Sequence, residues 1–258
     1  MPSFTTLLVE SDQAGYKRAT QPQFLAAAAA GKVPKEVLGQ WLANERLFLH
    51  AYIKGVGRLI SSLQLPHLSG SAQAPDPVTE FLDLSVEGLA NARPEEVFLT
   101  ETASKYGINI NLPAHGDDWI AEGDKIEGLR RFEALFGSIT CNDSTFLPWL
   151  ESAVLFYATD KIYTDAWKWA RSQLESNGDG TTDLDDGILR QLLIPRWSNP
   201  EWDVFVERLG KLIDDSVDRE VALHQEGIKH HLSERAREQW KLVLTAEETF
   251  WPKFQAVQ

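Results

Sequence analysis

The sequence predicts an all-α fold, a single bundle of long helices around a central ligand pocket. Apolar residues recur at the three- and four-residue spacing of amphipathic helices, and no run shows the alternation of a strand bounded by hairpin turns. Short Gly- and Pro-containing breakers separate these segments, and neither a repeat nor a flexible linker divides the chain. Residues 1–258 are therefore expected to form one helical domain without strands.

Four long helices account for most of the predicted bundle. The first carries leucines and aromatic residues at helical spacing, and the second begins after Ser144, a residue type that caps helices. The third opens on Asn199, Pro200 and Glu201, the order of a cap, a first-turn proline and a first-turn acid. The expected ranges are 34–63, 144–176, 199–224 and 233–254.

Composition narrows the possible partners and the compartment. The 25 basic and 38 acidic residues give a net charge of −13, which repels nucleic acid and anionic membranes alike. No stretch has the roughly 20 apolar residues of a membrane span, and the first residues lack the pattern of a secretory signal. Cys141 is the only cysteine, which fits a reducing compartment. We expect a soluble cytoplasmic protein.

Three carboxylates interrupt the apolar stripes of the predicted helices. Glu45, Asp160 and Glu247 each stand where the helical spacing calls for a core residue. An ionised carboxylate facing a core costs several kcal/mol unless it is paired, hydrogen-bonded or solvated. Such residues either lie at the edge of a stripe, paired with an arginine, or line a polar pocket. Their joint occurrence at mid-helix favours the pocket, which nearby aromatic rings would complete.

Three segments, taken in order, resemble the TenA, or thiaminase II, family. They are residues 20–33, residues 41–48 and the Glu-x-x-Phe-Trp sequence at 247–251. The resemblance extends from about residue 18 to residue 254, except for a region around 65–120 that has no match. It implies a haem oxygenase-like helical bundle that binds a thiamin-derived aminopyrimidine between its central helices. It also implies a dimer or tetramer.

The same resemblance assigns roles to individual residues. Glu45 takes the place of the acid that holds the pyrimidine nitrogens, and Glu247 that of the proton donor and acceptor. Phe48 and Phe146 stand where the family has tyrosines, so two hydroxyls are missing. The catalytic cysteine of the family falls at Thr159. A cysteine-lacking branch of the family is associated with hydrolysis of damaged aminopyrimidines, and this chain is closer to that branch.

We therefore expect a hydrolase of a thiamin-derived aminopyrimidine that needs no cofactor or metal. Its predicted catalytic acids and bases are Glu247 and Asp160. The predicted substrate-binding residues are Glu45, Phe48, Phe146, Tyr163, Trp202 and Phe250.

Two other readings of the sequence remain open. In the first, the chain is a non-catalytic or repurposed small-molecule binder, as the missing cysteine and tyrosine hydroxyls would allow. In the second, it is a di-iron carboxylate oxygenase or oxidase on the same fold. The second lacks the Glu-x-x-His pairs typical of such sites, because Glu220 and His224 are four residues apart.

Overall fold

A computed structural model describes residues 2–67, 76–116, 119–141, 146–174, 182–224 and 226–253. Within these ranges nearly all regular structure is helical, which confirms the predicted all-α class. A 3₁₀ turn at Glu122–Asp124 and a π-helical turn at Leu189–Leu193 complete the helical elements. The helices are α1 (Phe4–Ser11), α2 (Gln13–Thr20), α3 (Gln23–Ala29), α4 (Lys35–Ser62), α5 (Pro77–Tyr106), α6 (Glu127–Gly137), α7 (Leu150–Ser172), α8 (Ile194–Trp197), α9 (Glu201–His224) and α10 (Glu226–Glu248).

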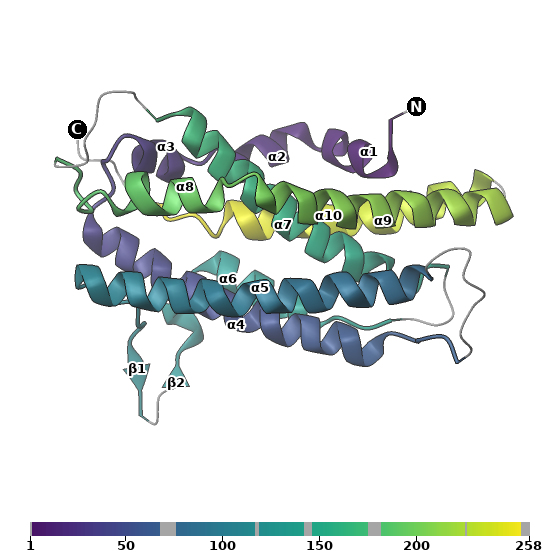
Figure 1. Cartoon of the computed structure of the whole chain (residues 1–258), viewed down its shortest axis with the longest axis horizontal. Coiled ribbons are helices and arrows are strands. Elements are labelled where there is room, and N and C mark those ends of the chain that lie inside the picture. The colour runs from purple at the N-terminus through teal and green to yellow at the C-terminus, as the bar shows by residue number, and fades with distance from the viewer. Residues whose placement is uncertain are drawn as a thin grey trace.

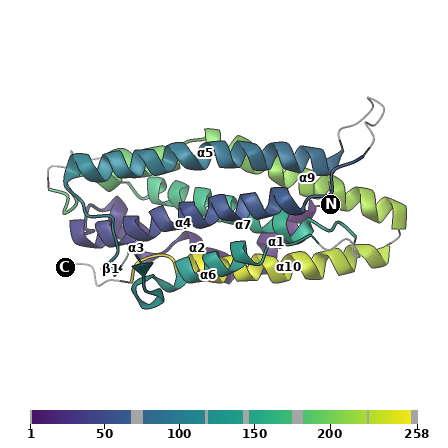
Figure 2. The same ribbon diagram turned by 90° about the horizontal axis from the view of Figure 1, so that it is seen from below.

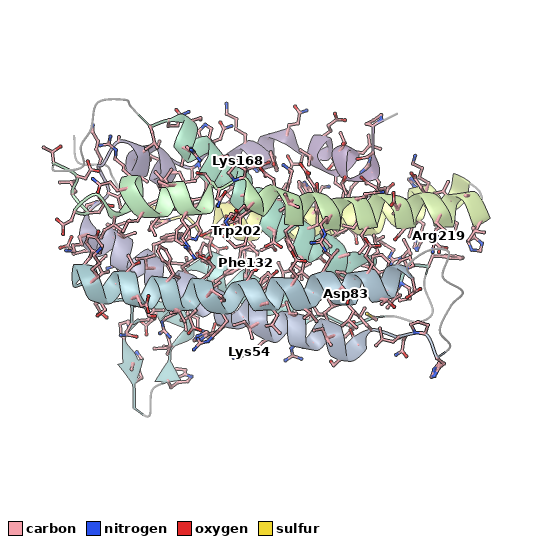
Figure 3. The ribbon with its side chains drawn as sticks, viewed as in Figure 1. Lys54, Asp83, Phe132, Lys168, Trp202 and Arg219 are labelled. Carbon is pink, nitrogen blue, oxygen red and sulfur yellow. The ribbon has the colours of Figure 1, made fainter. Side chains whose placement is uncertain are left out.

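The long helices lie roughly along one axis and form three layers (Figures 1 and 2). Helices α5 and α9 make one outer layer, α4 and α7 the middle layer, and α6 and α10 the other outer layer. Figure 3 shows Phe132 inside the bundle, whereas the charged Lys54, Asp83 and Arg219 lie on its outside. The middle layer is thus covered on both faces, so polar side chains on α4 and α7 are held away from bulk water.

The largest departure from the predicted bundle is α5, a 30-residue helix within the region that has no match to the family. Asp76 caps its first turn by accepting a hydrogen bond from the Thr79 backbone N–H at 3.0 Å, and Pro77 follows at the first helical position. Gly107 ends it in the left-handed conformation at φ 62°. The bundle therefore contains a fifth long helix.

The prediction of no strands is wrong for one short hairpin. Strand β1 (Ala114–His115) pairs antiparallel with β2 (Trp119–Ile120), and the hairpin projects from the bundle (Figure 1). Its two-residue strands are too short to give a sequence period.

The predicted helix boundaries hold for α4 and α9 and need correction for the other two. Helix α7 begins at Leu150 rather than Ser144, and the proposed cap Ser144 lies outside the described residues. Helix α10 begins at Glu226 rather than Ser233 and ends at Glu248 rather than Phe254.

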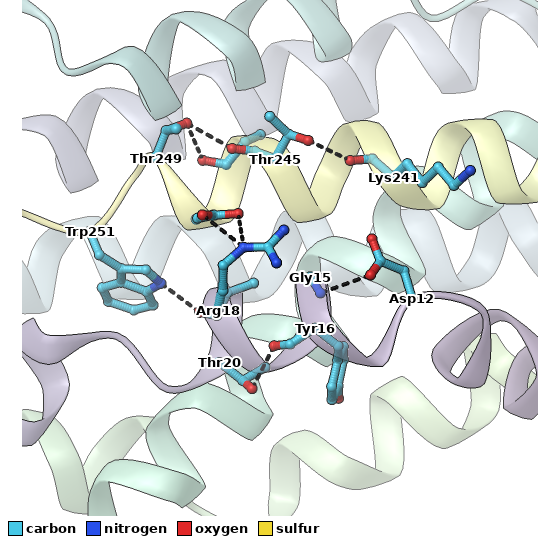
Figure 4. A network of polar contacts seen from close by, with 12 residues as sticks. Asp12, Gly15, Tyr16, Arg18, Thr20, Lys241, Thr245, Thr249 and Trp251 are labelled. Carbon is cyan, nitrogen blue, oxygen red and sulfur yellow. Dashed lines mark hydrogen bonds and ion pairs between the residues drawn. The ribbon is translucent and has the colours of Figure 1, made fainter.

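Side-chain contacts join the end of α10 and the residues after it to α2 (Figure 4). Arg18 pairs with Glu248 at 2.9 Å, and the Trp251 indole N–H donates to the Ala19 carbonyl at 2.8 Å. Helix α2 packs against both α7 and α10. These contacts fix the rotation of the last turn of α10, which carries Glu247 into the interior.

Within the described part of the chain, no helix has the length and apolar character needed to cross a membrane.

Candidate functional site

A cavity of about 100 Å³ opens between the middle layer and the layer of α5 and α9. That space holds several water molecules or one small ring compound. Trp202, labelled at α9 in Figure 3, forms part of its wall. The lining residues are Glu45, Phe48, Leu49 and Tyr52 of α4, Gly88, Asn91, Ala92, Glu95 and Leu99 of α5, Thr159, Asp160, Tyr163 and Thr164 of α7, Trp197 of α8, and Trp202, Phe205 and Val206 of α9.

Five of the eight predicted site residues meet at this cavity: Glu45, Phe48, Asp160, Tyr163 and Trp202. They come from three helices and from positions up to 157 residues apart in the chain (202 minus 45). The carboxylates that interrupt the stripes of α4 and α7 therefore face a cavity rather than the edge of the bundle.

Phe146 is the predicted substrate-binding residue that the structure puts elsewhere. It precedes α7, is 42% exposed, and its ring centroid lies 4.8 Å from that of His224. The later start of α7 explains the difference, because a helix from Ser144 would have turned Phe146 inward. Phe146 therefore does not line this cavity.

Phe250 supports the cavity without lining it. It is 2% exposed, and its ring lies edge-on to Phe48 with the centroids 5.5 Å apart. Phe132 closes the same cluster, 5.0 Å from Phe48. The ring of Phe48 is therefore packed from behind and presents its free side to the cavity.

Glu45 is a buried acid, and one of its two carboxyl oxygens is hydrogen-bonded. Its Oε1 accepts a hydrogen bond from the Tyr163 hydroxyl at 3.1 Å, whereas Oε2 is buried without a partner among the described residues. Burial raises the pKa of Glu45 to about 8, the Tyr163 hydrogen bond lowers it, and the charge of Glu95 raises it. The unpartnered oxygen is a place where a ligand donor would be favoured.

Glu247 stands behind this wall, because it is 2% exposed and does not line the cavity. Its Oε1 is also buried without a partner in the described chain. Burial raises the pKa of Glu247 well above its usual range, and the charge of Glu45 raises it further. Two neighbouring buried carboxyls do not both ionise easily, so this pair retains a proton at neutral pH.

Asp160 is the second acid of the cavity wall. The Tyr52 hydroxyl donates to its Oδ2 at 3.4 Å, and burial raises the pKa of Asp160 to about 7. Gly88 of α5 leaves room for this hydroxyl, because a Cβ there would lie 2.9 Å from the Tyr52 oxygen. A carboxyl that titrates near neutral pH can both give and take a proton.

Thr159, which the sequence resemblance aligned with the family's catalytic cysteine, lines the cavity. Its hydroxyl donates to the Leu155 carbonyl at 2.8 Å, an ordinary intrahelical contact. Cys141 lies outside the cavity lining, with its sulfur 3.2 Å from the Ser62 hydroxyl. The one thiol of the chain is thus not at the site.

Sequence reasoning missed the contribution of α5 and α8. Asn91 and Glu95, one helical turn apart, bring a polar edge to the cavity, and Trp197 of α8 brings another indole. The four-residue spacing of Asn91 and Glu95, with the small Gly88 and Ala92 beside them, was the only available signal, and it lay in the region without a match.

No three His, Cys, Asp or Glu side chains in the described ranges are grouped so as to hold a metal ion. Glu220 and His224 form a pair at 3.5 Å near the end of α9. The di-iron alternative therefore has no ligand set in that part of the molecule.

Comparison with known proteins supports the fold. No family model and no curated protein sequence matches the chain. Among solved structures, a TenA homologue from Pyrococcus furiosus has a TM-score of 0.68 at 21% identity, over 96% of this chain and 98% of that one. A TenA homologue from P. horikoshii has a TM-score of 0.64 at 13% identity, over 97% of both chains. A protein described as a TenA family transcription regulator, from Silicibacter sp., has a TM-score of 0.61 at 12% identity, over 97% of both.

These structures match almost the whole length of the chain, including the region around 65–120 that the sequence resemblance did not cover. The chain therefore has the fold of the TenA homologues.

Proposed function

We propose that this protein binds a thiamin-derived aminopyrimidine in the cavity and hydrolyses it, with Glu247 and Asp160 as proton donors and acceptors. The observation that carries the proposal is the pair of buried carboxyls, Glu45 and Glu247, that each keep one oxygen without a partner among the described residues. Leaving such atoms unpaired is costly, so they are kept where a ligand or substrate needs them.

The lining of the cavity favours a flat ligand that carries amino groups. Aromatic rings form much of the wall, and the polar groups include the acids Glu45, Glu95 and Asp160, whereas none of the described lining residues is basic. An amino group would donate to Glu45 Oε2, and a ring would pack on Phe48. A phosphorylated ligand would meet like charge, so the unphosphorylated form is favoured.

The chemistry we propose is acid–base hydrolysis. For an N-formylated aminopyrimidine, water adds its oxygen to the formyl carbon and gives one proton to a carboxylate. The C–N bond then breaks as a protonated carboxyl returns a proton to the leaving amine, so the products are formate and the free amine. The raised pKa of Glu247 keeps it protonated as a donor must be, and Asp160 titrates in the range a base needs.

The missing thiol argues against the covalent route of the family. The Thr159 hydroxyl donates its hydrogen bond to the Leu155 carbonyl rather than to a carboxylate. We therefore assign the reaction to water rather than to a nucleophilic side chain.

Thermal-shift binding with thiamin, hydroxymethyl and aminomethyl aminopyrimidines and an N-formylated aminopyrimidine tests the ligand class. A ligand at a hundredfold excess over its Kd stabilises by about 2.7 kcal/mol. We expect an aminopyrimidine to raise Tm, and Glu45→Ala to weaken that binding. A panel without any shift would refute the ligand class.

Product formation then tests the mechanism. We expect Glu247→Gln to abolish turnover and to leave binding largely intact. Glu238→Gln is the matched control, since Glu238 also lies on α10 but is exposed. Normal turnover by the Glu247 variant would remove our mechanism.

A second candidate function is ligand binding without turnover. The position of Glu247 behind the cavity wall favours it, because a catalytic group ordinarily reaches its substrate directly. A raised Tm with an aminopyrimidine but no product from the wild-type protein would select this alternative.

Assembly into a dimer or tetramer and a cytoplasmic location also stay predictions.

A further inference from the structure

The outer wall of the cavity is held by a hydrogen-bonded carboxylate on α5. Glu95 receives two charged hydrogen bonds from Arg196, from Nε to Oε2 at 2.9 Å and from Nη2 to Oε1 at 2.7 Å. The Trp197 indole N–H donates to the same Oε2 at 3.1 Å. The Arg196 guanidinium also lies over the Phe98 ring, 4.0 Å from its centroid. Such a bidentate, stacked arginine fixes geometry as well as charge.

Helix α8 needs such contacts because it has little stability of its own. It is a four-residue helix that directly follows the π-helical turn at Leu189–Leu193. One helical turn is too short to persist without tertiary contacts, and π-helical turns are frequent at functional sites. On its far side, the Trp202 indole N–H donates to the Arg196 carbonyl at 3.3 Å. Side chains from α5 and α9 therefore set the position of α8.

A continuous set of contacts leads from Glu95 to the buried acid of α4. The Trp197 ring lies edge-on to Tyr163, with centroids 5.9 Å apart and planes at 63°. The Tyr163 hydroxyl in turn donates to Glu45 Oε1 at 3.1 Å. All four side chains line the cavity. A shift of Trp197 would remove the packing that holds Tyr163 in the orientation its hydrogen bond requires.

We propose that Glu95 is a positioning residue. By holding Arg196 and Trp197 in place, it keeps the Tyr163 hydroxyl hydrogen-bonded to Glu45 and so keeps Glu45 in the state that binds the ligand. The ligand in this statement rests on the function proposed above. The effect of Glu95 on α8 and Tyr163 does not depend on that function, and it can be measured on the ligand-free protein.

The first experiment is hydrogen exchange on the ligand-free protein. We expect Glu95→Ala to speed exchange of the amides of α8 and the turn before it. Glu87→Ala is the matched control: Glu87 also lies on α5 and pairs with two oxygens to an arginine, Arg208 of α9, but on the exposed surface. It should leave exchange at α8 unchanged. Equal exchange at α8 in wild type and both variants would overturn the proposal.

The second experiment is the pH dependence of affinity for the aminopyrimidine that binds wild type. Losing the buried contacts of Glu95 should weaken affinity roughly tenfold in Glu95→Ala. Losing the Tyr163 hydrogen bond raises the pKa of Glu45, whereas losing the Glu95 charge lowers it. Glu95→Gln loses the same charge, so the midpoint of the profile should lie at higher pH in Glu95→Ala than in Glu95→Gln. Glu95→Gln should recover part of the affinity, since its amide oxygen still accepts from Trp197. A purely structural role would weaken affinity but leave the same midpoint in both variants.

The outcomes separate the two proposals. If no aminopyrimidine binds wild type, the proposed ligand fails, while the exchange experiment still decides the role of Glu95. If Glu95→Ala does not fold, Glu95→Gln and Trp197→Phe take its place. Trp197→Phe keeps an aromatic ring at this position but removes the indole N–H that donates to Glu95. Unchanged exchange at α8 in both of these variants would overturn the proposal as well.

Discussion

Replacing Glu45 by glutamine should change how the stability of the protein depends on pH. In the unfolded chain Glu45 ionises at its ordinary pKa of 4.5, whereas in the folded protein burial raises its pKa to about 8. Between these values the folded state holds a proton that the unfolded state has lost. The free energy of unfolding therefore falls as pH rises from 4.5 to 8, and levels off above 8.

The size of the effect follows from the two pKa values. Between pH 6 and pH 9, the Glu45 contribution falls by about 3 kcal/mol in wild type. Glu45→Gln lacks this contribution. Its amide N–H groups replace an oxygen that has no partner in the described chain, which costs about 1–3 kcal/mol, but that cost does not change with pH. The stability of the variant relative to wild type should thus rise by about 3 kcal/mol between pH 6 and pH 9, whatever the size of that constant cost.

The assay is urea unfolding of both proteins at pH 6 and pH 9, with equal m-values as the condition for comparing midpoints. Glu87→Gln, on the exposed surface of α5, measures what removing any one carboxylate does to the same comparison. A stability difference between wild type and Glu45→Gln that stays constant from pH 6 to pH 9 would show that Glu45 is not a buried acid with a raised pKa.

Further substitutions test other parts of the site. Thr159→Cys in a Cys141→Ala background should place a thiol on the cavity wall, where aminopyrimidine binding slows its alkylation. Cys141→Ala alone should leave activity unchanged. An alkylation rate that does not change with ligand would argue that position 159 is not at the site. Gly88→Ala should displace the Tyr52 hydroxyl from Asp160, since its Cβ would lie 2.9 Å from that oxygen, and so weaken ligand affinity measured by calorimetry. Gly57→Ala, also in a helix but with no neighbour within 4 Å, is its control and should stabilise the protein by about 0.5–1 kcal/mol.

The middle layer of the fold is predictable because its signal is local. In α4 the apolar spacing is regular enough to fix the rotation of the helix, so an acid at Glu45 stands out against it. Asp160 in α7 and Glu247 in α10 stand out for the same reason, and all three prove to be in the interior. The spacing does not show how each side chain lies relative to the cavity. It therefore did not distinguish Asp160, which lines the cavity, from Glu247, which does not.

The outer layer is harder to predict because its helices lack a single apolar face. Helix α5 contacts both α4 and α9, and its small residues Gly88 and Ala92 and its acid Glu95 face the cavity rather than a packed core. Pro94 inside the helix and the exposed Val86 and Val97 further weaken the helical pattern. Phe146 lies outside the cavity lining because α7 begins only at Leu150, six residues after the predicted start at Ser144.

This division of the site has a consequence for ligand selection. The acids Glu45 of α4 and Asp160 of α7 are held by the middle layer and its packing, and we expect them to determine which proton-bearing groups the cavity accepts. The shape of the opposite wall is set by Asn91, Glu95 and Trp197, which come from α5 and α8. Changes on that wall alter the space available to a ligand without touching the buried acids. We therefore expect substitutions at Asn91 to change which aminopyrimidine substituents bind, while substitutions at Glu45 weaken binding of all of them.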